Sequence, residues 1–314
     1  MGAAMGWVAF CASPTYRRRF LENSARAGYS FGAVRAAVAH AGRMVAELPR
    51  LWLGAPLPCG MVGEACVEQA YAAGRGIVFL TPHQGCFELS AQAAARHWSA
   101  ERGPITVLYR PARQPWLARV METARNRPGM LAVPTTLSGV RQMIKALRRG
   151  EAVGLLPDQV PPDGQGVWSP FFGRDAYTMT LAVRLAQQTG AAVVLARCER
   201  LPWGRGFVTH FEPLPAPLDE RLESAVLQIN QAMEHLIRQC PEQYLWGYAR
   251  YKQPRAEATP GGAALPGAWG CGSCGCWRMC RCPRCARWAG AWVSCCTFWP
   301  CRAARWRCAT WRCV

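Results

Sequence analysis

The chain has 314 residues and an apolar fraction of 51%, which excludes a protein too polar to bury a core and allows one large domain or two small ones. The formal net charge is +18, of which +8 comes from residues 258–314, a segment with eight Arg and no Asp, Glu or Lys. The remaining +10 favours an anionic partner, such as a phosphate-bearing lipid, an anionic membrane surface, an acidic carrier protein or a nucleic acid.

The cysteines are distributed as unevenly as the charge. Eleven of the seventeen lie in residues 258–314, and six are scattered through the rest of the chain. Scattered single cysteines are typical of small buried apolar residues in a reducing compartment. The start of the chain lacks a basic segment before its apolar run, so we expect no cleavable signal peptide.

The N-terminal segment Ala3–Ser13 is apolar and is followed by Pro14 and by the cluster Arg17-Arg18-Arg19. It is too short to span a bilayer, which takes about 20 residues. Apolar residues followed by arginines fit a segment that lies on an anionic membrane surface. A buried N-terminal helix with a solvated basic end fits equally well, so both interpretations stay open.

Hydrophobic periodicity predicts an alternation of helices and strands. We expect helices at Leu21–Leu53, Val62–Ala73, Cys86–His97, Gln114–Asn126, Leu137–Arg149, Thr178–Gln188 and Leu218–Gln239. We expect strands at Gly76–Leu80, Ile105–Tyr109, Leu131–Val133, Ala152–Pro157, Ala191–Ala196 and Phe207–Phe211. Strands separated by helices of this length predict an α/β fold, with a mixed, mainly parallel sheet flanked by helices.

The stretch Gly76–Ser90 contains the first candidate for catalysis. The strand ends at Thr81-Pro82, His83 follows, and Glu88 comes five residues later. On one regular helix these two side chains would not share a face, so they meet only if His83 lies in a loop and Glu88 in the first helical turn. A carboxylate that accepts a hydrogen bond from one ring nitrogen leaves the other nitrogen free to act as a base. A capping or packed histidine beside an ordinary first-turn acid is the structural alternative.

Ligands of such sheets collect at the carboxyl ends of the strands. His83 follows one predicted strand, Arg110 ends the next, and Asp158 ends a later one, so we expect these groups at a common cleft. Asp158 is suited to orient a basic group or to hold an acceptor, or else it caps a turn. The guanidinium of Arg110 suits a phosphate or a developing oxyanion.

Six segments in order carry a resemblance to a known family. They are His83–Glu88, Val107–Pro111, Ala124–Arg127, Leu156–Gln159, Pro170–Gly173 and Pro241–Trp246. Together they resemble the lipid A biosynthesis acyltransferases, the lauroyl and myristoyl transferases of Gram-negative bacteria, within the lysophospholipid acyltransferase superfamily. The resemblance covers roughly residues 20–255. Members usually begin with a longer hydrophobic anchor, so the chain is expected to start part-way into one.

The resemblance implies a glycerolipid acyltransferase-like fold and an acyl-carrier-protein donor. The acceptor would be a hydroxyl of a lipid A precursor or of another lysolipid, at the cytoplasmic face of the bacterial inner membrane. His83 would be the base and Glu88 would orient it. The resemblance also places Arg110, Arg125, Asp158 and Gln159 in the substrate site. The basic charge indicates an anionic membrane surface as a further partner, and we expect no nucleic acid. Attack of an alcohol on a thioester needs a base and an oxyanion stabiliser, so we expect no metal and no cofactor.

Two further features beside His83 bear on mechanism. Cys86 lies three residues on, and a thiol near a helix start is a possible acylated nucleophile, although the resembled family gives this position no such role. The aromatic segment Val167–Gly173 is predicted to line a groove for an acyl chain, with ordinary core packing as its alternative.

Residues 258–314 differ in composition from the rest of the chain, with Cys, Trp, Arg, Gly, Ala and Pro dominant. Cys271-x2-Cys274 and Cys282-x2-Cys285 allow a zinc interpretation, but the spacing is irregular and apolar residues for a core are few. The composition favours a frameshifted or otherwise aberrant tail. We therefore divide the chain into a membrane-proximal helical segment (1–58), an acyltransferase domain (59–257) and this tail (258–314). A rival of another class is a basic zinc-binding or nucleic-acid-binding protein that acts through the tail.

Overall fold

The computed structural model describes residues 1–109, 114 and 126–255. Seven strands of this part form one sheet in the order β1-β9-β8-β2-β5-β3-β4. Their bounds are β1 (Cys59–Val62), β2 (Ile77–Leu80), β3 (Ile105–Tyr109), β4 (Met130–Pro134), β5 (Ala152–Leu155), β8 (Ala192–Arg200) and β9 (Phe207–Pro213). Neighbouring strands are parallel except β8 and β9, which are antiparallel. The predicted α/β fold with a mixed, mainly parallel sheet is confirmed.

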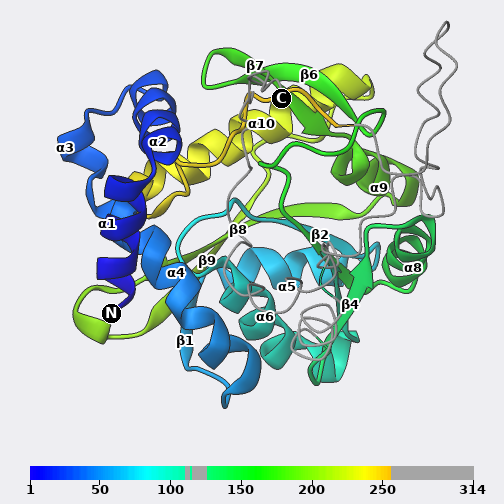
Figure 1. Ribbon diagram of the computed structural model, residues 1–314. Helices are drawn as coiled ribbons and strands as arrows, with labels where there is room; N and C mark the ends of the chain where they lie inside the picture. Colours follow the sequence, from blue (N-terminus) through cyan, green and yellow to red (C-terminus); the bar gives the residue numbers. More distant parts are fainter. Residues whose placement is uncertain (110–113, 115–125, 256–314) are drawn as a thin grey trace, which may run out of the picture. The chain divides into compact units, whose positions relative to one another are not determined.

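Helices cover both faces of the central strands, which explains why these strands are apolar on both sides (Figure 1). Ile77 and Phe79 of β2 pack in a cluster with α5 (Glu64–Ala72) and α6 (Phe87–Arg102). Val78 and Leu80 pack in a second cluster with α8 (Leu137–Arg148), α9 (Leu181–Thr189) and α10 (Leu222–Gln239). The alternation of side chains along β2 therefore gives each layer of helices its own part of the core.

The N-terminal region is divided more finely than the sequence predicts. Instead of one helix over Leu21–Leu53, the structure has α2 (Pro14–Arg26), α3 (Phe31–Val34) and α4 (Ala36–Leu53), after α1 (Gly2–Ala12). The chain leaves α2 through Gly28, whose φ of 89° belongs to the left-handed region that glycine adopts readily. Ser30 then caps α3, with its side chain accepting a hydrogen bond from the Ala33 amide. The Ala-rich periodicity masked these stop and start signals.

Helix α1 packs closely on α4 through small residues. A Cβ atom on Gly6 would fall 2.0 Å from the backbone oxygen of Val38, so only glycine permits this approach. The opposite side of α1 leaves Met5, Trp7 and Val8 exposed. Helix α1 therefore combines one packed face with an exposed apolar face. Within the part of the chain that the structure describes, no helix has both the length and the hydropathy needed to cross a bilayer.

A β-hairpin that the sequence analysis did not predict precedes α9. Its strands β6 (Gly166–Phe171) and β7 (Arg174–Met179) are joined by Phe172 and Gly173, which both have positive φ, as a tight hairpin turn requires. The hairpin is held to α10 by the Asn230 side chain, which donates to the Pro170 oxygen at 2.9 Å. Because β7 extends to Met179, the helix predicted from Thr178 begins only at Leu181.

Candidate active site

The candidate site lies at the carboxyl ends of two neighbouring parallel strands. Leu80 of β2 pairs with Leu155 of β5. His83 comes three residues after Leu80, and Asp158 comes three residues after Leu155. The equal offset places both side chains at the same edge of the sheet, where ligands of α/β proteins collect. The predicted convergence of His83 and Asp158 is therefore present in the fold.

Two hydrogen bonds join these residues. The Nδ1 atom of His83 lies 2.7 Å from Oδ1 of Asp158, and the His83 amide donates to Oδ2 at 2.9 Å. A carboxylate only accepts, so Nδ1 carries the proton and Nε2 is the unprotonated nitrogen of the neutral ring. Within the described residues Nε2 has no hydrogen-bond partner, and His83 lines a cavity. The arrangement is that of a base whose ring is oriented by a buried carboxylate.

The carboxylate of Asp158 keeps its charge although it is buried. Burial by itself would raise the pKa of Asp158, but the charge of His83, its two hydrogen bonds and the charge of Arg250 outweigh burial and hold this pKa below its ordinary value. Arg250 is itself buried and donates to the Tyr177 oxygen at 2.7 Å. Asp158 is therefore ionised in the pH range in which the protein would work, and it stabilises a positive charge on His83.

Backbone hydrogen bonds fix the loop that carries His83. The Gly85 amide donates to the Gln243 oxygen at 3.0 Å, and the Cys86 amide donates to the Cys198 oxygen of β8 at 2.9 Å. The Leu245 amide donates to the His83 oxygen at 3.2 Å. Gly85 has a φ of 59°, and a Cβ atom there would fall 1.9 Å from the Cys198 oxygen. The loop therefore fits between β8 and residues 243–245 only with glycine at this position.

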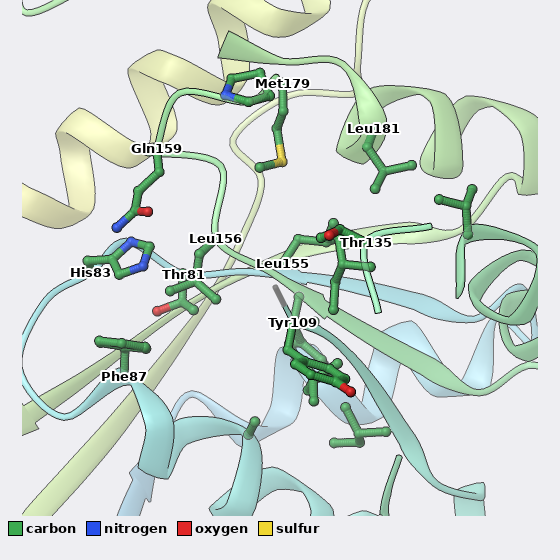
Figure 2. A pocket seen from close by; sticks show the side chains of 18 of the residues that line it. Thr81, His83, Phe87, Tyr109, Thr135, Leu155, Leu156, Gln159, Met179 and Leu181 are labelled. Carbon is green, nitrogen blue, oxygen red and sulfur yellow. The ribbon is translucent and has the colours of Figure 1, made fainter. Parts of the chain in front are cut away.

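A cavity of about 1030 Å³ opens beside His83. Figure 2 shows the His83 ring close to Gln159 and Phe87, across the cavity from Thr135 and Leu181. The part of the cavity between the sheet and α6 is apolar, and the part near α8 and α9 carries hydroxyls and a guanidinium. The apolar part is lined by Phe79, Ala91, Ala94, Ile105, Val107, Met130, Gly154, Ala196 and Phe211. The polar part includes Thr135, Thr136, Gln165, Thr180 and Arg184, beside the apolar Leu137, Val140, Met179 and Leu181.

Comparison with known proteins places this site in a family. Residues 33–253, which contain the whole seven-stranded sheet and the His83–Asp158 pair, match the family model described as bacterial lipid A biosynthesis acyltransferase. The chain belongs to this family. The resemblance found in the ordered segments of the sequence is therefore confirmed.

Relatives within the family support the same assignment. The lipid A biosynthesis lauroyltransferase of Escherichia coli K12 is 30% identical over 64% of this chain and 63% of its own length. The lipid A biosynthesis acyltransferase of Haemophilus influenzae is 27% identical over 59% of this chain and 56% of its own. The lipid A biosynthesis palmitoleoyltransferase of Escherichia coli K12 is 26% identical over 62% and 61%. The matched part of the chain spans less than two thirds of each relative.

The structure changes the part expected of Glu88 in this acyltransferase-family site. We expected Glu88 to orient His83, but the carboxylate bonded to Nδ1 is that of Asp158. Glu88 is the first-turn acid of α6 and lines the same cavity, as does Gln159. Arg110 and Arg125, the other predicted site residues, lie outside the described residues. Spacing in the sequence favoured Glu88, which is near His83 in the chain. That Asp158 lies beside His83 can be inferred only once β2 and β5 are known to be neighbouring strands.

The aromatic segment Val167–Gly173 does not line the cavity, contrary to the prediction. Phe171 and Phe172 are 2% and 5% exposed and belong to the core cluster. The Arg250 guanidinium lies 4.9 Å from the centre of the Phe171 ring. Core packing, the alternative left open, describes this segment, because the hairpin turns its apolar face toward α10.

Cys86 is poorly suited to act as a nucleophile. Its side chain is 2% exposed, packs against Leu51, Leu89 and Cys198, and is not among the residues that line the cavity. Burial raises the pKa of the Cys86 thiol to about 12, so the thiol stays protonated at neutral pH. These observations favour direct attack by an acceptor over an acylated cysteine. Within the described residues no group of three or more His, Cys, Asp or Glu side chains is placed to hold a metal ion.

Proposed function

We propose that the protein transfers a fatty acyl chain from acyl-carrier-protein to a hydroxyl of a lipid A precursor. The observation that carries the proposal is the His83–Asp158 pair, whose free ring nitrogen belongs to a residue that lines a large, partly apolar cavity. Membership of the lipid A biosynthesis acyltransferase family and the names of the relatives support the same reaction class and substrates.

In the proposed reaction Nε2 of His83 takes the proton of the acceptor hydroxyl while the hydroxyl oxygen attacks the thioester carbonyl carbon. The resulting imidazolium is stabilised by the carboxylate of Asp158, which holds the proton on Nδ1 in place. When the tetrahedral intermediate collapses, the C–S bond breaks and His83 returns the proton to the leaving sulfur. Atoms and charges balance without a metal or redox cofactor.

The other predicted site residues would bind and position the substrates around His83. Glu88 and Gln159 line the same cavity as His83, and Gln159 lies close to His83 in Figure 2; in the proposal their side chains position the acceptor hydroxyl. Arg110 and Arg125 would bind phosphate or stabilise the oxyanion, as the family resemblance implies. The acyl chain would occupy the apolar part of the cavity, since burying its methylene groups is favourable by about 0.8 kcal/mol each.

Gly154 provides a test of the acyl site. A Cβ atom on Gly154 would have Val107 Cγ1 at 3.3 Å as its one neighbour within 4 Å, so a larger side chain there would project into the apolar part of the cavity. Gly154→Val should lower transfer of the longest accepted chain by about tenfold or more, since an extra branched side chain in a filled site costs about 1–3 kcal/mol. Transfer of a chain several carbons shorter should change little. Competition between donors of different length measures this preference.

Gly60→Val is the matched control for the chain-length test. Gly60 is an exposed strand glycine with a comparable first neighbour, Val208 Cγ2 at 3.4 Å, and it does not line the cavity. This variant should keep the chain-length preference of the wild type. An unchanged preference in Gly154→Val, in a folded protein, would place the acyl chain elsewhere.

The cytoplasmic face of the inner membrane is the proposed location. The exposed apolar face of α1, with Met5, Trp7 and Val8, would lie in the lipid interface. The basic cluster Arg17-Arg18-Arg19 at the start of α2 would lie against anionic headgroups. The acidic acyl carrier and the membrane-borne acceptor would then meet at a basic surface, consistent with the net charge of the chain.

The experiment that tests the proposed function compares acceptors under one set of conditions. The protein is incubated in membranes with acyl-carrier-protein donors and either a lipid A precursor or a lysophospholipid. Acyl transfer to the lipid A precursor is the expected result. Transfer to the lysophospholipid alone would keep the chemistry and replace the acceptor, which is the nearest alternative. The zinc-binding or nucleic-acid-binding alternative depends on residues 258–314, which lie outside the described residues.

A further inference from the structure

The polar part of the cavity contains a cation for which the proposed chemical steps have no use. Arg184, on α9, lines the cavity and is exposed. Its Nε atom donates to the Thr180 hydroxyl at 3.3 Å, and within the described residues the two terminal guanidinium nitrogens make no hydrogen bond. Across the described residues no carboxylate forms an ion pair with it. A guanidinium whose two terminal nitrogens face a cavity is suited to bidentate hydrogen bonding with an oxyanion.

The surroundings of Arg184 fit an anion as well. Thr180 is buried and holds the guanidinium in place, since its hydroxyl accepts from Arg184 and donates to the Gln165 oxygen at 3.4 Å. The hydroxyl-bearing residues Thr135 and Thr136 line the cavity at the end of β4. Among the described residues that line the cavity, Glu88 is the one that carries a carboxylate. It belongs to α6, which lies on the opposite face of the sheet from α9. The hydroxyls of Thr135 and Thr136 can donate to a ligand, and together with the cation they favour a negatively charged ligand group on this side of the cavity.

This part of the cavity is remote from the base. Leu181, in the first turn of α9, and Thr135 lie across the cavity from His83 in Figure 2. A group held there would not react, but it would fix the rest of its molecule relative to Nε2 of His83. Such a contact acts on substrate binding and orientation rather than on the chemical step.

We propose that Arg184, oriented by Thr180, forms with Thr135 an anchoring subsite for a phosphate group of a substrate. The inference rests on the proposed acyl transfer, in which two molecules can supply a phosphate: the acceptor lipid and the phosphopantetheine arm of the donor. Both have the same recognition chemistry at Arg184. The choice between them is made by measuring the KM of each substrate separately.

The test compares wild type, Arg184→Gln and Arg184→Lys in acyl transfer with the full-length protein. Loss of a charge-assisted contact to phosphate should raise the KM of one substrate about 10- to 100-fold in Arg184→Gln, with kcat changed far less. Arg184→Lys should recover part of this loss. With the phosphate removed from that substrate, by a dephosphorylated acceptor or an acyl-pantetheine donor, wild type and Arg184→Gln should have equal KM. The substrate whose KM responds identifies the source of the phosphate.

Arg148→Gln is the matched control, since Arg148 is an exposed arginine in the last turn of α8 that does not line the cavity. An equal KM in wild type and Arg184→Gln, or an equal rise in Arg148→Gln, would overturn the subsite. If wild type transfers no acyl chain to any acceptor, the proposed function fails on its own. Equilibrium binding of the phosphorylated acceptor and of acyl-carrier-protein then decides the subsite, and equal binding by wild type and Arg184→Gln would refute it.

Discussion

Asp158→Asn is expected to lower acyl transfer by about 10³- to 10⁴-fold, the effect of removing the carboxylate of a histidine–carboxylate pair. Asn keeps the shape of the side chain, but it no longer supplies the negative charge that faces His83 from 2.7 Å. It also allows the ring to take the tautomer in which Nε2 carries the proton and is no longer a base. The measurement is kcat for acyl transfer at saturating acceptor, with far-ultraviolet circular dichroism to verify folding.

Asp163→Asn is the control for this substitution. Asp163 is an exposed acid in the same loop, and its Oδ1 accepts only the neighbouring Gly164 amide among the contacts of the described residues. This variant should retain nearly full activity. More than a tenth of wild-type activity in a folded Asp158→Asn protein would contradict the role given to Asp158.

Gly85→Ala is expected to destabilise the protein by roughly 3 kcal/mol or more and to abolish most of its activity. The added methyl group would lie 1.9 Å from the Cys198 oxygen, and a backbone atom in a central strand cannot yield as a flexible side chain does. The loop must move, and His83 moves with it. Urea unfolding measures the free energy of unfolding, and the acyl-transfer assay measures the displacement of the base.

Gly74→Ala separates the clash from the backbone conformation. Gly74 has a φ of 67°, close to that of Gly85, but a Cβ atom there meets nothing within 4 Å. Its substitution should therefore cost only about 1 kcal/mol, the strain of a left-handed alanine, and should leave activity intact. Equal losses of stability and activity in Gly85→Ala and Gly74→Ala would contradict this account. Close packing of the catalytic loop against β8 would then not be what holds His83 in place.

The elements that position the site were predictable because their signals are local. The apolar run before Thr81-Pro82 predicts β2, and the run before Pro157 predicts β5, so the sequence alone puts His83 and Asp158 at strand ends. Their hydrogen bond depends on β2 and β5 being adjacent and in register at Leu80 and Leu155. That is a property of the whole sheet, so the spacing favoured the nearer acid Glu88, whereas the structure places Asp158 against Nδ1.

The hairpin of β6 and β7 and the break between α2 and α3 were not predicted from the sequence, because their local signals are weak and tertiary contacts determine them. The hairpin of β6 and β7 has a turn built from Phe172 and Gly173, and phenylalanine at positive φ is not a turn signal. Its burial is secured by Asn230 and Arg250, which reach it from α10 and from the end of the described chain. The break between α2 and α3 at Gly28 was overlooked because alanines on both sides continue the helical pattern.

The central claim is that Nε2 of His83 is the base for acyl transfer to a lipid A precursor. The most direct test is mass spectrometry of that precursor after incubation with acyl-carrier-protein donors and membranes that contain wild-type protein or His83→Ala. We predict a mass gain of one acyl chain with the wild type and no detectable gain with His83→Ala. A gain of one acyl chain that survives in His83→Ala would contradict the claim.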